Sequence, residues 1–136
     1  MHDFTAIARE VLELEAKELL NAAALIGDEM REATELVAGL KGKLIITGVG
    51  KSGLIGAKIA ATLASTGTSS FFLHPTEALH GDLGMIGKED AVLAISYSGE
   101  SEELIKILPH IKRFDIPLIG MAKTRSSSLG RYSDIF

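Results

Sequence analysis

The chain has 136 residues, the size of one domain, and 46% of them are hydrophobic, which is enough for a buried core. The absence of cysteine excludes disulfides and thiolate zinc sites, and a net charge of −4 without a basic run disfavours nucleic-acid binding. No apolar stretch reaches the roughly 18 residues of a membrane span, and the N-terminus lacks a basic-then-apolar signal pattern. These features predict a soluble cytoplasmic protein.

Two helices are predicted before the first strand. Asp3 can cap a helix that ends near Gly27, and Asp28 can cap a second helix that ends within residues 39–42. Both carry apolar side chains at helical spacing, namely Phe4, Ile7, Ala8, Val11, Leu12, Leu19, Leu20 and Ala23 in the first and Met30, Ala33, Leu36, Val37 and Leu40 in the second. Such a pair either packs on a partner subunit, which predicts a homo-oligomer, or covers its own sheet.

Strands and helices then alternate to the end of the chain. The predicted strands are residues 43–47, 69–73, 90–96 and 117–121, with residues 133–136 as the start of a fifth. This order predicts an α/β fold, a three-layer α/β/α sandwich around a parallel, doubly wound, flavodoxin-like sheet. We expect one domain over residues 1–136, with the helical pair at 1–41 and the alternating core at 42–136. The chain stops inside the expected fifth strand, so the C-terminal part of this domain is predicted to be missing.

The stretch of residues 44–53 reads as a buried strand, a glycine turn and a helix start. Amides at a helix start lack partners within the helix and favour an anion, and Lys51 adds a full positive charge. We therefore predict that this turn, with Ser52 beside Lys51, binds phosphate. The alternative is that the glycines only allow a tight turn of the backbone. That alternative does not account for Lys51 and Ser52.

Two better-known phosphate loops fit this stretch poorly. A nucleotide P-loop needs glycine at the position occupied by Ile45. The dinucleotide pattern G-x-G-x-x-G is present at Gly48, Gly50 and Gly53. That pattern also needs an acidic residue at the end of the next strand, which instead ends in His74 and a proline.

A second turn of the same kind follows the third strand. Hydroxyls of Ser96, Ser98 and Ser101, with the amides around Gly99, can hold a phosphate by several neutral donors. The alternative is that these serines only cap the next helix. In a doubly wound sheet, ligands bind at the carboxyl ends of the strands, and both turns are expected at that edge.

Acids and histidines near these turns are candidates for proton chemistry. Glu100, Glu102 and Glu103 lie in a first helical turn, where acids stabilise the helix dipole, but a carboxylate beside a sugar phosphate can also move a proton between carbons. His74 and His80 lie in the polar loop after the second strand. They can polarise a carbonyl, move protons or bind a divalent metal, or they can be structural.

Four segments resemble one known family: Gly-Val-Gly-Lys-Ser-Gly (48–53), Ala-Ser-Thr-Gly-Thr (64–68), His-Pro-Thr-Glu-Ala-Leu-His-Gly-Asp-Leu-Gly-Met (74–85) and Ser-Tyr-Ser-Gly-Glu-Ser (96–101). Together they resemble the sugar isomerase (SIS) domain of the D-arabinose-5-phosphate isomerases, over nearly the whole chain. The resemblance implies an aldose–ketose isomerase that interconverts D-ribulose 5-phosphate and D-arabinose 5-phosphate. This reaction supplies the precursor of Kdo for lipopolysaccharide or capsule and requires no cofactor.

The resemblance also implies roles for single residues. Lys51 and Glu103 match catalytic residues, and His80 matches a histidine that contacts substrate. His74 matches one that contacts substrate or an inhibitory zinc ion. We call residues 96–101 the serine turn. In the resulting hypothesis the serine turn holds the phosphate, Lys51 stabilises charge, and Glu103 or His80 moves protons.

Further family features concern assembly and length. Gly67 and Thr68 match a substrate-contacting pair, and family members are usually tetramers with sites shared between subunits. Tyr97 stands where relatives often carry Asn or Gln. The family continues with another catalytic glutamate, a late histidine and often CBS domains, all beyond residue 136. The alternatives are a non-catalytic sugar-phosphate-binding regulatory module and a hexulose-phosphate isomerase.

Overall fold

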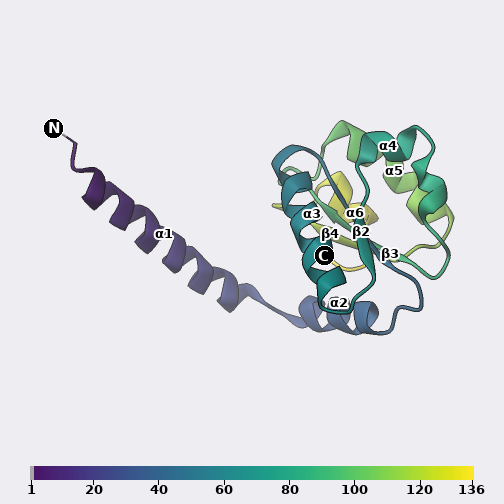
Figure 1. The fold of residues 1–136 in the computed structure, drawn as a ribbon, viewed down its shortest axis with the longest axis horizontal. Helices are drawn as coiled ribbons and strands as arrows, with labels where there is room; N and C mark the ends of the chain where they lie inside the picture. The colour runs from purple at the N-terminus through teal and green to yellow at the C-terminus, as the bar shows by residue number, and fades with distance from the viewer. Residues whose placement is uncertain (1) are drawn as a thin grey trace. The chain divides into compact units, whose positions relative to one another are not determined.

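The computed structural model describes residues 2–136, whose helices and strands are labelled in Figure 1. The chain forms two compact units that meet after Arg31 in the sequence. The second unit includes the C-terminal part of the predicted helical pair, because Leu36, Val37 and Leu40 pack against the buried side chains Leu44 and Ile46 of the core. The two units are described separately below.

The first unit consists mainly of one long helix, α1 (Phe4–Leu25). Asp3 caps it as predicted, because its Oδ1 accepts hydrogen bonds from the backbone N–H groups of Thr5 and Ala6, both at 3.0 Å. None of its side chains is buried, and its large apolar residues, from Phe4 to Leu25, are exposed. No helix among the described residues is long and apolar enough to cross a membrane.

Helix α2 (Asp28–Ala38) begins at Asp28 itself. The carboxylate of Glu29 accepts the backbone N–H of Gly27 at 2.9 Å, whereas Oδ1 of Asp28 accepts from the guanidinium of Arg31 at 3.4 Å. The prediction that Asp28 caps this helix is therefore wrong. The competing acid one position later reaches back to the N–H group that precedes the helix.

The second unit is built on a four-stranded parallel sheet in the order β2-β1-β3-β4, which confirms the predicted fold class. Its elements are β1 (Leu44–Gly48), α3 (Gly50–Ser65), β2 (Ser70–Phe72), α4 (Pro75–Leu79), the 3-10 helix η1 (Asp82–Met85), β3 (Ala91–Ile95), α5 (Glu102–Arg113), β4 (Leu118–Met121) and α6 (Ser128–Tyr132). Of the expected fifth strand, the structure contains one isolated parallel bridge between Ile119 and Ile135.

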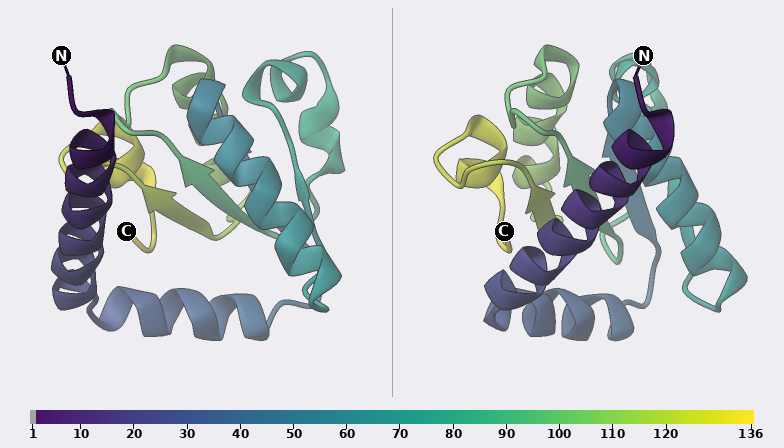
Figure 2. Two further views of the ribbon diagram at one scale, coloured as in Figure 1. Left: turned by 60° about the vertical axis from the view of Figure 1, so that its left-hand side comes forward. Right: turned by 90° about the vertical axis from the view of Figure 1, so that its left-hand side faces the viewer.

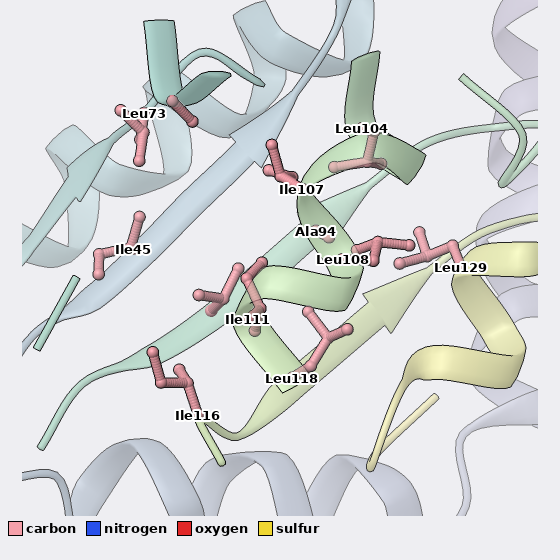
Figure 3. Close-up of a cluster of buried hydrophobic side chains, with 12 residues drawn as sticks. Ile45, Leu73, Ala94, Leu104, Ile107, Leu108, Ile111, Ile116, Leu118 and Leu129 are labelled. Atoms are coloured by element: carbon pink, nitrogen blue, oxygen red, sulfur yellow. The ribbon is translucent and has the colours of Figure 1, made fainter. Parts of the chain in front are cut away.

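Successive side chains of each strand point to opposite faces of the sheet, so the strands contribute side chains to two hydrophobic cores, one on each face. Ile45, Val92 and Leu118 are buried on the face that α5 covers (Figure 3). Leu44, Ile46 and Ala91 are buried on the other face, against Ala60 of α3. Figure 2 shows α3 and α5 on opposite sides of the sheet, which completes the three layers.

Small residues bring α3 close to the sheet. A Cβ atom on Gly56 would lie 3.1 Å from Cγ2 of Ile46, and Gly53 and Gly56 are both buried. The first turn of α3 is thereby fixed against the end of β1. Any group at the start of this helix is held on a rigid support.

Asp90 anchors two loops at the amino edge of the sheet. Its buried carboxylate accepts the backbone N–H of Lys43 at 2.7 Å and that of Gly87 at 2.6 Å. We expect Asp90→Ala to lower the free energy of unfolding by about 2–3 kcal/mol, because two partly buried hydrogen bonds lose their charged acceptor. Urea denaturation measures this change. Glu89→Ala is the control, since its exposed neighbouring side chain should matter little, and equal stability of the two variants would contradict the expectation.

Candidate functional site

The two predicted turns lie side by side at the carboxyl edge of the sheet. Gly48 ends β1, Ile95 ends β3, and the two residues are partners in the sheet register. A Cβ atom on Gly48 would lie 2.8 Å from the carbonyl oxygen of Ile95 and 3.2 Å from the amide nitrogen of Gly53. Only glycine permits this approach. β2 lies on one side of β1 and β3 on the other, so the two turns flank the point where strand order reverses, where open α/β sheets bind ligands.

The first turn presents an uncapped helix start. Gly50, the first residue of α3, has a φ of 60°, and the N-cap residue Val49 provides no side-chain hydrogen bond. The amides at this end are therefore available to an anion. Lys51 is exposed in the same turn, and no ion pair joins it to any other described residue.

An open hollow of about 510 Å³ lies beside Lys51. Its walls are mainly apolar, from Leu54, Ala57 and Phe72, and His74 lines its rim. The ring of His74 meets that of Phe72 edge to face, with centroids 6.4 Å apart. The structure thus brings the predicted residues Lys51 and His74 together across one cavity.

His74 also caps α4, because its Nδ1 accepts the backbone N–H of Thr76 at 3.2 Å. In the neutral ring the proton is then on Nε2, which makes His74 a hydrogen-bond donor. A zinc ion on Nε2 would need that proton to move to Nδ1, which would break the bond to Thr76. Residues 2–136 contain no group of three or more His, Asp or Glu side chains placed to hold a metal.

In the second turn, serine hydroxyls build the backbone loop. Oγ of buried Ser96 accepts the backbone N–H of Gly99 at 3.1 Å and lies 3.0 Å from Oγ of Ser101. Oγ of Ser98, which is exposed, accepts the backbone N–H of Glu100 at 3.1 Å. Ser101 is the N-cap residue of α5 but makes no side-chain capping bond. The capping explanation therefore fails for Ser101, and the start of α5 stays open to a ligand.

The three acids of this region differ in their partners. Oε1 of Glu100 accepts the backbone N–H of Ser128 at 2.7 Å, and this bond lowers the pKa of Glu100. Lys106 donates to Glu102 at 2.6 Å, and this bond lowers the pKa of Glu102. Glu103 is half-buried, and no hydrogen bond or ion pair joins its carboxylate to another described residue. Glu103 is thus the acid that remains available for chemistry.

Of the predicted residues, only Lys51 and His74 line the hollow, and three of the others lie outside both turns. His80 is exposed at the C-terminal end of α4 and does not line it. Gly67 and Thr68 precede β2, whose first residue pairs with Leu44, so they lie at the amino edge of the sheet. The length of β1, roughly 13 Å at about 3.3 Å per residue, separates them from the Lys51 turn. Within one chain, this pair and Lys51 do not reach the same small molecule.

Comparison with known families matches residues 40–136 to the SIS domain. The chain belongs to the SIS domain family. This confirms the resemblance inferred from the glycine, histidine and serine segments. It also places both phosphate-type turns and the whole sheet inside the matched region.

Curated relatives of this SIS domain include named enzymes. Arabinose 5-phosphate isomerase KdsD of Pseudomonas aeruginosa is 48% identical over 133 residues, which cover 98% of this chain and 41% of that protein. KdsD of Escherichia coli K12 is 47% identical over 133 residues, 98% of this chain and 40% of that protein. The chain therefore spans about 40% of the length of these relatives.

Solved structures agree with the sequence relatives. The structure of E. coli CFT073 c3406 in complex with arabinose 5-phosphate superimposes with a TM-score of 0.85 at 40% identity. It covers 99% of this chain, and this chain covers 73% of that one. The same fold is thus known in a protein that holds this sugar phosphate.

The sequence missed two features of this SIS domain. The hydroxyl of Thr47, at the buried end of β1, has no hydrogen-bond partner among the described residues. Residues 123–129 follow β4 and contact the serine turn through the carbonyl of Tyr97 and the carboxylate of Glu100. Ligand sites in such folds lie at the carboxyl ends of the strands. Because residues 123–129 follow the fourth strand, this rule could have indicated that they lie near the site.

Proposed function

We propose that this SIS domain belongs to an arabinose 5-phosphate isomerase, an aldose–ketose isomerase that interconverts D-arabinose 5-phosphate and D-ribulose 5-phosphate. The observation that carries the proposal is the contact between the two turns, where Gly48 and Ile95 adjoin at the switch point of the sheet. One turn supplies a cation and the other supplies hydroxyls and amides. The names of the relatives and the arabinose 5-phosphate complex of the c3406 structure support the choice of substrate.

In the proposed mechanism the serine turn and the start of α5 bind the phosphate. A base removes the proton from C2 of the aldose, electrons shift to the C1 oxygen, and an enediol forms after that oxygen gains a proton. The proton then returns to C1 while the C2 hydroxyl loses its own, which leaves the ketose. Glu103 is the proposed base, Lys51 stabilises the developing negative charge, and Nε2 of His74 donates to a substrate oxygen. Atoms and electrons balance within the sugar, so no cofactor is needed.

We further propose the biological setting that this activity implies. The product D-arabinose 5-phosphate would supply Kdo synthesis in the cytoplasm. Kdo belongs to lipopolysaccharide or capsule, and the proposal covers either destination.

A direct assay tests the proposed function. The chain is incubated with D-arabinose 5-phosphate, and D-ribulose 5-phosphate is measured over time. Conversion supports the isomerase, and a panel that includes hexulose phosphates tests the choice of sugar. Absence of both binding and conversion would contradict the proposal.

Binding without conversion would favour the second candidate, a non-catalytic sugar-phosphate-binding regulatory module. The position of His80 favours keeping this candidate, because one chain gathers both binding turns but leaves this histidine outside the hollow. A calorimetric titration with D-arabinose 5-phosphate, run beside the assay, separates the two candidates.

We also propose that copies of the chain assemble, as a tetramer, so that His80, Gly67 and Thr68 serve the site of another copy. The separation of these residues from Lys51 supports this proposal, as do the exposed apolar side chains of α1.

We expect a mixture of Lys51→Ala and His80→Ala proteins, each strongly impaired alone, to regain part of the activity after exchange of subunits. Light scattering gives the mass of the assembly. A monomeric mass, or no recovery from an assembly shown to exchange its subunits, would contradict shared sites.

A further inference from the structure

A short segment after β4 is hydrogen-bonded to the serine turn. We define the tether segment as residues 123–129. The carbonyl of Tyr97 accepts the backbone N–H of Lys123 at 2.9 Å, and the carbonyl of Gly99 accepts that of Leu129 at 3.1 Å. Two consecutive loops at the carboxyl edge are thereby joined along most of the turn.

The contact is close at its centre. Gly99 is buried with a φ of 67°, and a Cβ atom there would collide with Oγ and Cβ of Ser127. Ser127 is itself fixed, because its buried Oγ accepts the backbone N–H of Gly130 at 3.1 Å. The position of the Gly99 backbone is therefore fixed by the tether segment as well as by β3, the strand that precedes the serine turn.

One side chain adds to these backbone bonds. Oε1 of Glu100 accepts the backbone N–H of Ser128 at 2.7 Å, across 28 positions of the chain. Ser128 begins α6, so the carboxylate fastens the serine turn to the first residue of that helix. This hydrogen bond can be removed by substitution without touching Ser96, Ser98 or Ser101.

The position of this acid needs an explanation. A carboxylate next to a phosphate site repels the ligand, so Glu100 has an electrostatic cost for the proposed function. Stabilisation of the helix dipole does not require it, because Glu102 and Glu103 already lie in the first turn of α5. Glu102 pairs with Lys106, and no hydrogen bond or ion pair joins it to the described residues of the tether segment.

We propose that Glu100 is a positioning residue, whose carboxylate holds the serine turn against the tether segment in the shape that binds a sugar phosphate. The inference rests on the proposed function, and it assigns Glu100 no contact with the substrate. The bond from Ser128 also lowers the pKa of Glu100 below its ordinary value of 4.5. The carboxylate is therefore charged, and the bond complete, at neutral pH, and the bond weakens only as the pH falls through the lowered pKa.

Two measurements on three variants test this role. Glu100→Ala removes the bond, Glu100→Gln keeps an oxygen acceptor without the charge, and Glu102→Ala is the matched control that removes a neighbouring exposed acid. In the absence of ligand, we expect faster amide hydrogen exchange in residues 98–101 and 128–129 of Glu100→Ala only. With D-arabinose 5-phosphate, we expect its affinity to fall on the order of fivefold in Glu100→Ala, as suits the loss of one exposed charge-assisted hydrogen bond.

The control variants separate positioning from charge. Loss of repulsion alone would tighten binding in both alanine variants, whereas positioning predicts weaker binding in Glu100→Ala and wild-type or tighter binding in Glu100→Gln. Unchanged exchange in Glu100→Ala, or equal effects in Glu100→Ala and Glu102→Ala, would overturn the inference. If the wild-type chain binds D-arabinose 5-phosphate and Glu100→Ala binds it equally well, only the inference fails. If the wild-type chain does not bind it, the proposed function fails and this inference with it.

Discussion

Lys51→Ala should lower the rate of sugar-phosphate interconversion by about 10²-fold or more while the fold stays intact. Lys51 lies in the first turn of α3 and lines the hollow beside His74. Removal of a preorganised group that stabilises developing negative charge typically costs about 10²- to 10³-fold in turnover. The side chain is exposed and makes no ion pair with another described residue, so its loss should leave thermal stability almost unchanged. Initial rates and circular-dichroism melting curves measure the two effects.

Lys58→Ala is the matched control for this prediction. Lys58 is an exposed lysine on the same helix, and it does not line the hollow. The two variants change the net charge of the chain equally, so a general electrostatic effect would appear in both. Near-normal turnover of Lys51→Ala, or an equal loss in Lys58→Ala, would remove Lys51 from the mechanism.

The fold was predictable because its signals are local and mutually consistent. The largely apolar segments 43–47 and 90–96 predicted buried parallel strands, and the small residues after the first of them favour a helix close to the sheet. The carboxyl-edge rule then placed the Lys51 and Ser98 turns together before any coordinates. The contact between Gly48 and Ile95 confirms this placement.

The positions of the histidines were less predictable. The loop after β2 contains α4, which His74 caps and Pro75 begins, so His80 is carried to the far end of this short helix. Sequence spacing does not reveal such a separation, because both residues belong to the same motif. The hydrogen-bond partners of the three acids were equally hard to predict from the sequence. Whether Glu100, Glu102 or Glu103 is free depends on Ser128, which lies far away in the chain, and on the rotamer that Lys106 adopts.

Subunit-level features lie outside what one chain's pattern determines. An apolar helix such as α1 fits either a partner subunit or its own sheet, because the local spacing of its apolar residues is the same in both cases. Gly67 and Thr68 illustrate the same point. Their motif is local in sequence, but the folded chain places them at the amino edge of the sheet, while the Lys51 turn lies at the carboxyl edge. The two groups therefore cannot contact the same small molecule within one chain.

Glu103→Gln should lower the interconversion rate by about 10²- to 10⁴-fold, the usual contribution of a positioned proton-transfer group. The substitution keeps the size and hydrogen-bonding ability of the side chain but removes its basicity, so substrate binding should persist. Glu103 is half-buried in the first turn of α5, beside the serine turn. The exchange of the C2 proton of D-arabinose 5-phosphate with deuterated solvent, followed by NMR, measures the step directly.

Glu102→Gln is the control for Glu103→Gln, since the adjacent carboxylate is engaged by Lys106 and should not reach the substrate. If Glu103 is the base, its variant loses exchange and conversion together while affinity for the sugar phosphate stays within a few-fold of wild type. Retained exchange at C2 would instead point to a base other than Glu103, and His80 is the other candidate for that role. The same experiment on Lys51→Ala should show slowed exchange as well, because an unstabilised enediolate would raise the barrier for the proton transfer proposed for Glu103.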